Sequence, residues 1–295
     1  SGAEAVFVRT PIVDPFCPAT SDVDLLVFGQ VDDLCPQRLF LSEGFSEKRS
    51  SQSVFDVTWY PAKSLDDPHF LALAGLVAHR FLKSAPVFDP AGHAVAQREV
   101  VSGLMYQPQL RAQRIASFLH MGYLTVREIG ITWDFPALAG LWIQMAHAAC
   151  VAAILDGIGG LCPNVYTRPF GYVEEIELNT GTSLRQLLIS TLRLDSDPVR
   201  LIEPLRRIHH AGSRFQEPDW APSILAATRA EYRYFMSGEE LDWRIRVARE
   251  MVERGDGPAA VWYLRFWAYS LARIPIVSAR AQEGISVSFL RPERA

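Results

Sequence analysis

Residues 21–28 read SDVDLLVF and carry the strongest local signal in this chain of 295 residues. The apolar part of the stretch, with its valine, leucine and phenylalanine, predicts a buried β-strand. Side chains two apart on a strand point to the same face, so Asp22 and Asp24 project together from the start of that strand. Two adjacent carboxylates repel each other, and burying them without a partner is costly. A divalent cation removes this cost, and Mg²⁺ takes carboxylate oxygens while it keeps positions for water and substrate phosphates.

A third acidic residue lies in a similar setting further along the chain. Asp56 interrupts the apolar run of residues 54–59, which reads VFDVTW and predicts a second strand. If this strand pairs beside the first, three carboxylates converge on one site. Two-metal nucleotidyl transfer requires such a convergence, because the ions together activate the attacking oxygen and clamp the reacting phosphorus. The alternative, for the strand of Asp22 and Asp24 as well as for that of Asp56, is a strand at the edge of the sheet with its acidic side chains in solvent.

The rest of the chain changes character at about residue 110. Before this point short β-like runs alternate with turn residues, and after it long amphipathic or apolar stretches follow one another. We therefore predict the α+β class, with a mixed sheet in residues 1–108 and an all-helical bundle in residues 109–295. The expected strands are 5–8, 23–28, 54–59, 86–88 and 285–289, and the expected helices are 70–81, 110–122, 136–157, 182–194, 199–211, 222–236, 239–254 and 258–272.

Several features predict a cytoplasmic protein that does not bind membranes. The uncharged run of residues 137–155 approaches the length of a membrane span, but it contains Gln144, His147 and many small residues, which favours a central helix of a soluble bundle. The N-terminus lacks a charged segment followed by an apolar one, so no signal peptide is expected. The four cysteines form no CxxC pair and are typical of apolar fillers in a reducing compartment.

Composition and charge narrow the classes of partner. The chain is 49% hydrophobic and 21% charged, which is typical of globular proteins and excludes a disordered chain. A formal net charge of −4 argues against nucleic acid as the partner, because such binding depends on neutralising phosphates. Residues 1–108 hold 8 Lys and Arg against 13 Asp and Glu, a net charge of −5, whereas the rest of the chain carries +1. The predicted sheet half is therefore the acidic half.

The stretch SDVDLLV at residues 21–27 resembles the S-D-x-D-L-L-V motif of the polymerase-beta-like nucleotidyltransferase superfamily. The likeness is to its small-molecule branch, the aminoglycoside and lincosamide nucleotidyltransferases, and the distance to Asp56 fits the third carboxylate of that family. The resemblance implies a nucleotidyltransferase domain in residues 1–108 and an NTP as co-substrate. It also implies two Mg²⁺ ions, or Mn²⁺, held by the carboxylates of Asp22, Asp24 and Asp56.

The chain departs from this family at the turn that holds the triphosphate. The family usually has a Gly-Ser pair there, whereas this chain has Thr10-Pro11 or, with a longer loop, Arg9-Thr10. Proline has no N–H to donate, and the conformational freedom of glycine is missing. We expect the Thr10 hydroxyl and the Arg9 guanidinium to contact the triphosphate instead, together with Ser21 of the motif.

These observations predict an enzyme that moves a nucleoside monophosphate from an NTP to a hydroxyl of a small-molecule acceptor and releases pyrophosphate. Asp56 would also help to take the proton of the acceptor, and the acidic sheet half suits a cationic acceptor such as an aminoglycoside. Two alternatives stay open. One is a toxin-type nucleotidyltransferase that acts on a protein or tRNA, and the other is a catalytically inactive relative that serves as a nucleotide-binding or interaction module. Whether the chain forms a homodimer also stays open.

Overall fold

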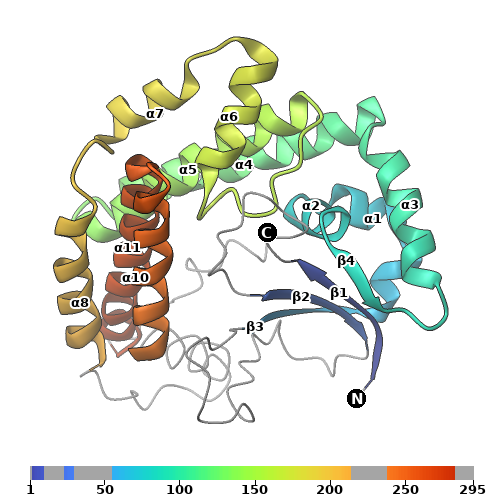
Figure 1. The fold of residues 1–295 in the computed structure, drawn as a ribbon, viewed down its shortest axis with the longest axis horizontal. Coiled ribbons are helices and arrows are strands. Elements are labelled where there is room, and N and C mark those ends of the chain that lie inside the picture. Colours follow the sequence, from blue (N-terminus) through green and yellow to red (C-terminus); the bar gives the residue numbers. More distant parts are fainter. Residues whose placement is uncertain (1, 10–22, 30–54, 214–237, 283–295) are drawn as a thin grey trace. The chain divides into compact units, whose positions relative to one another are not determined.

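The N-terminal strands form a mixed, four-stranded sheet in the computed structural model of the chain (Figure 1). The structure describes residues 2–9, 23–29, 55–213 and 238–282. The predicted α+β class, with a sheet at the N-terminus followed by helices, is confirmed. The strands are β1 (Ala3–Arg9), β2 (Val23–Gly29), β3 (Phe55–Pro61) and β4 (Ala85–Phe88).

The strand order is β3-β2-β1-β4, so β2 lies between two neighbours. Strand β1 is antiparallel to both β2 and β4, whereas β3 is parallel to β2. The alternative of an edge strand is therefore wrong for β2, which carries Asp24. Strand β3, which carries Asp56, lies at one edge of the sheet that the structure describes.

One face of the sheet forms the core of the N-terminal part. Phe7 of β1 and Phe28 of β2 are fully buried, and each packs edge-on against Phe81, with ring centroids 4.9 and 5.3 Å away. Tyr60 of β3 stacks on Phe28 at 5.6 Å. Every second residue of β1 from Ala5 onwards is buried on this face, as the period of two in a strand requires. The alternation of buried and half-buried residues along β1 therefore identifies the side that faces the core.

Short helices follow the first three strands. The expected helix over residues 70–81 is two helices, because the chain turns at Gly75 with a positive φ of 46°. Asp67 accepts a hydrogen bond from the backbone N–H of Phe70 and so caps the first of them. The helix α3, directly after β4, was not expected. These elements are the 3₁₀ helix η1 (Ala62–Asp66) and the helices α1 (Pro68–Leu73), α2 (Leu76–Leu82) and α3 (His93–Met105).

The remaining described residues are helical, with short connections. Most expected helices are present, and α6 is an additional one that the sequence did not predict. The helix expected at residues 222–236 and the strand expected at 285–289 lie outside the described residues. The helices are α4 (Pro108–Ile131), α5 (Pro136–Gly157), α6 (Pro169–Thr180), α7 (Leu184–Leu192), α8 (Val199–Ser213), α10 (Gly238–Glu253) and α11 (Gly257–Gln282).

The chain divides into two compact units. The first contains Ser1–Phe118 together with Ala152–Asn164, and the second contains Leu119–Val151 and Val165–Ala295. The first unit thus extends past residue 108 and takes in the end of α5. Among the described helices, α5 alone is long and apolar enough to cross a membrane by length and composition, and 67% of its apolar window is buried. The core helix of a soluble protein passes the same test.

Candidate functional site

The candidate site is the end of the sheet at which Arg9, Asp24 and Asp56 meet in register. Arg9 is the last residue of β1 and lies directly opposite Asp24 on the antiparallel strand β2. Asp56 lies beside Asp24 on the parallel strand β3. The sequence-based expectation that the strand of Asp56 pairs beside the strand of Asp24 is therefore confirmed for the backbone.

Arg9 and Asp24 form an ion pair across the two strands. Strand alternation places Arg9 on the same face as Ala5 and Phe7, which is the face that packs in the core. Residues directly opposite each other on antiparallel strands share a face, so Asp24 projects from that face as well. A charge on a core face needs an opposite charge or strong hydrogen bonds nearby, and the pair meets that need.

The two members of this pair differ in their access to solvent. The Arg9 side chain is 1% exposed, whereas the Asp24 side chain is 18% exposed. The guanidinium is thus enclosed in protein, and the carboxylate keeps a route to small solutes. Of the two members of this pair, Asp24 is the one that a ligand can reach.

Three predicted site residues, Thr10, Ser21 and Asp22, lie outside the residues that the structure describes, as does the side chain of Asp56. Within the described residues no group of three His, Cys, Asp or Glu side chains is placed to hold a metal ion. The predicted set of three carboxylates therefore stays a prediction. For Arg9, which we expected at the triphosphate, the structure instead shows the ion pair with Asp24.

The residues that are placed fit a divalent cation in donor type. Carboxylate oxygens are the protein ligands that Mg²⁺ prefers, and two aspartates occupy one register position on paired strands. The ion pair adds a second feature, because the Arg9 guanidinium already neutralises Asp24. A metal ion at Asp24 would hold this carboxylate in competition with Arg9.

A second buried charge cluster lies in the first unit, away from any predicted site residue. Arg114 donates two hydrogen bonds of 2.9 Å to the carboxylate of Asp156 and further ones to the carbonyl oxygens of Ala72 and Met105. The side chains of Arg114 and Asp156 are 1% and 3% exposed. With both partners enclosed, this cluster ties α1, α3, α4 and α5 together and offers no group to a ligand.

The segment after Asp156 is held to the same unit by two further hydrogen bonds. The backbone N–H of Cys162 donates to His79 Nδ1 at 3.2 Å, and Arg80 Nε donates to the carbonyl oxygen of Pro163 at 3.2 Å. Burial, with the positive charge of Arg114 as a smaller cause, lowers the pKa of His79 from 6.5 to about 3. His79 is therefore neutral at pH 7 and acts as a structural acceptor.

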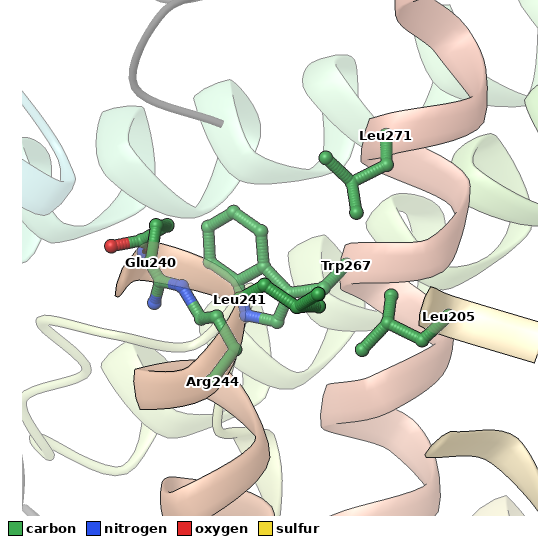
Figure 2. A pocket seen from close by; sticks show the side chains of 6 residues that line it. All are labelled: Leu205, Glu240, Leu241, Arg244, Trp267 and Leu271. Atoms are coloured by element: carbon green, nitrogen blue, oxygen red, sulfur yellow. Dashed lines mark ion pairs between the residues drawn. The ribbon is translucent and has the colours of Figure 1, made fainter. Parts of the chain in front are cut away.

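The second unit holds an arginine between two tryptophans. The Arg244 guanidinium lies 4.0 Å from the ring centroid of Trp243 and 3.5 Å from that of Trp267. It also forms an ion pair with Glu240, and Figure 2 shows Arg244 beside Glu240 and Trp267. It also donates to the hydroxyl of Tyr263 at 3.1 Å, and burial raises the pKa of that tyrosine. The adjoining pocket has a volume of about 10 Å³, which is room for one water at most. The pocket is lined by Leu205, Glu240, Leu241, Arg244, Trp267 and Leu271.

A larger hollow of about 280 Å³ lies at the start of β1, at the other end of that strand from Arg9. Polar groups on its wall come from Glu4, Asp89 and His93. The carboxylate of Asp89 accepts a hydrogen bond from the backbone N–H of Val95 in the first turn of α3. None of the predicted site residues lines this hollow, and the end of the sheet at Asp24 remains the candidate site.

Comparisons with protein-family models, curated proteins and solved structures found no match to this chain. The resemblance to nucleotidyltransferases therefore stays a prediction, carried by the residues themselves. Sequence reasoning missed the pairing of Arg9 with Asp24. The sequence holds no alternation that would mark Arg9, because residues 5–8 are all apolar and do not distinguish the two faces of the strand.

Proposed function

We propose that the chain is a metal-dependent nucleotidyltransferase that moves a nucleoside monophosphate from an NTP to a hydroxyl of a small molecule. The observation that supports this most directly is the shared register of Asp24 and Asp56 on paired parallel strands. Asp24 sits on the inner strand β2 with an exposed fraction that a ligand can reach. Two aspartates side by side at the end of a sheet could supply ligands for the metal ions of a phosphoryl-transfer site.

In the proposed reaction the acceptor oxygen bonds to the α-phosphorus of the NTP. The bond from that phosphorus to the bridging oxygen breaks, and pyrophosphate leaves with the electron pair. Asp56 would take the proton of the acceptor hydroxyl. Asp22, Asp24 and Asp56 would hold Mg²⁺, which when bound supplies positive charge against the triphosphate.

The acceptor is proposed to be a small cation, such as an aminoglycoside. The support is the charge of residues 1–108, which is −5 by formal count. Negative charge raises the local concentration of cationic solutes and lowers that of anions. The same charge makes metal ions necessary partners of the triphosphate, because an acidic surface repels it.

Nucleotide-dependent stabilisation tests the proposal. We expect one NTP with Mg²⁺ to raise the free energy of unfolding of the native chain by about 2.7 kcal/mol at a hundredfold excess over its Kd. Asp24→Asn should remove this gain, whereas Asp66→Asn should keep it, since the Asp66 side chain is 72% exposed and lies outside the candidate site. The measurement is thermal or urea unfolding with each NTP in turn.

Pyrophosphate release from the NTP, measured with a panel of aminoglycosides and related cations, then tests transfer. No stabilisation by any NTP would overturn the proposal, and so would a gain that Asp24→Asn leaves intact.

A second candidate function is a nucleotide-binding module without turnover. The ion pair of Arg9 with Asp24 favours it, because this carboxylate is already neutralised without a metal ion. If an NTP stabilises the chain but no acceptor leads to pyrophosphate release, the result would support the nucleotide-binding module. Release that depends on Asp24 would decide for the transferase.

A further inference from the structure

Arg9 is enclosed in the protein at the one place where a cation would bind Asp24. Its side chain is 1% exposed, and its guanidinium pairs with the carboxylate of Asp24 across the two strands. A guanidinium stays charged at all physiological pH values. The pair therefore persists at any pH at which Asp24 is ionised, and the site carries its own positive charge before any ligand binds.

A divalent ion at Asp24 and the guanidinium of Arg9 compete for the negative charge of one carboxylate. The guanidinium already contacts Oδ2 of Asp24, and two cations held at one carboxylate repel each other. The enclosed guanidinium has little freedom to withdraw into solvent, in contrast to an arginine on a surface. Binding of the ion to Asp24 therefore weakens the ion pair with Arg9, and this loss lowers the affinity for the ion.

We propose that Arg9 is a resident counter-cation of Asp24 that weakens the binding of divalent metal ions to the chain in the absence of nucleotide. This inference rests on the proposed function for the identity of the ion. It assigns to Arg9 a positioning role at the metal site, in place of the triphosphate contact that the sequence predicts.

Mn²⁺ binding to the protein without nucleotide tests the proposal, with free Mn²⁺ measured by electron paramagnetic resonance. We expect Arg9→Gln to bind Mn²⁺ about tenfold more tightly than the native chain, because the competing charged hydrogen bonds are gone. Arg9→Lys keeps the charge and serves as the matched control, with an affinity near the native one. The double variant Arg9→Gln with Asp24→Asn should lose the gain. Equal affinities in the native chain and Arg9→Gln, or a gain that survives Asp24→Asn, would overturn the proposal.

A second measurement uses the native chain and does not depend on how the variants fold. The Nε–Hε signal of Arg9 in a ¹⁵N spectrum, identified by its absence in Arg9→Lys, should shift as Mg²⁺ is added. A signal that stays unchanged to saturating Mg²⁺ contradicts displacement of the guanidinium. Neither measurement involves turnover. Tighter Mn²⁺ binding by Arg9→Gln, together with no pyrophosphate release, would therefore overturn the transferase and leave this inference standing.

Discussion

The first unit contains two buried arginine–aspartate pairs whose surroundings differ. Arg114 and Asp156 are both enclosed, and the guanidinium also donates to two backbone carbonyls. Arg9 is enclosed to the same degree, but its partner Asp24 is 18% exposed and lies beside Asp56 in the sheet register. The same two residue types therefore connect helices in one place and form a candidate ligand site in the other.

The two pairs therefore differ in the exposure of the acid, and this difference separates an enclosed structural pair from the candidate ligand site. A sealed pair cannot exchange its partner without unfolding its surroundings, because an uncompensated buried charge is strongly unfavourable. A pair with a reachable carboxylate can exchange it for an ion in solution. Three measurements test whether the exposure of an ion pair determines how much it stabilises this chain.

Arg114→Met should lower the free energy of unfolding by about 3–5 kcal/mol, because it leaves Asp156 buried and unpaired. Urea unfolding at pH 7 measures this loss. Adding Asp156→Leu to the same variant should recover part of it, since the double change removes the unpaired charge. A loss below about 1 kcal/mol for Arg114→Met would mean that the pair is not sealed, and the comparison would fail.

Acidification tests whether His79, whose pKa is lowered by burial and by Arg114, is held in its neutral form. The pKa of His79 is about 3 in the folded chain and about 6.5 in the unfolded one. The unfolded chain therefore binds more protons between these values, and stability falls as pH falls from about 6.5 towards 3. The slope from this one group is at most about 1.4 kcal/mol per pH unit.

Urea unfolding at pH 7, 6 and 5 measures this slope, and His79→Gln is the control, because glutamine keeps an acceptor for the N–H of Cys162 and does not titrate. The slope should be smaller in His79→Gln. Equal slopes in the two proteins would contradict the burial of a neutral histidine at this position.

The smallest effect is expected at a pair in solvent. Arg207 Nε lies 3.3 Å from Glu203 Oε1 on α8, with side chains 78% and 61% exposed. Exposed pairs of this kind contribute at most about 0.5 kcal/mol on a helix. Arg207→Gln should therefore leave the urea midpoint almost unchanged. A loss above 1 kcal/mol would show that exposure does not rank the ion pairs of this chain.

Local pattern predicted much of the fold. Runs of β-branched and aromatic residues bounded by turn residues identified the strands around Ala5, Leu26 and Val57. Long amphipathic or apolar stretches identified α4, α5 and α11. Two helices escaped prediction. The helix α3 follows a turn and has a short amphipathic pattern, and α6 contains a cluster of acids that resembles a charged turn. Both are stabilised by the contacts of residues such as Val101 and Ile176, which are buried in the folded chain.

The candidate site was predicted in part. The sequence singled out Asp24 and Asp56, and it named Arg9 for a different partner. Asp156 and His79 carried no signal as members of a buried cluster, because their partners lie far away in the chain. Arg114 and Asp156, for example, are 42 residues apart.

The positions of the strands and of most helices, and the aspartate at the start of a buried strand, could be predicted from the sequence. These properties depend on consecutive residues. The tertiary structure decided that Arg9 faces Asp24 and that Asp56 lies beside it. Strand order and register set those neighbours, and they depend on which distant segments pair. It also decided which acid is sealed and which is reachable, since burial is a property of the packed chain.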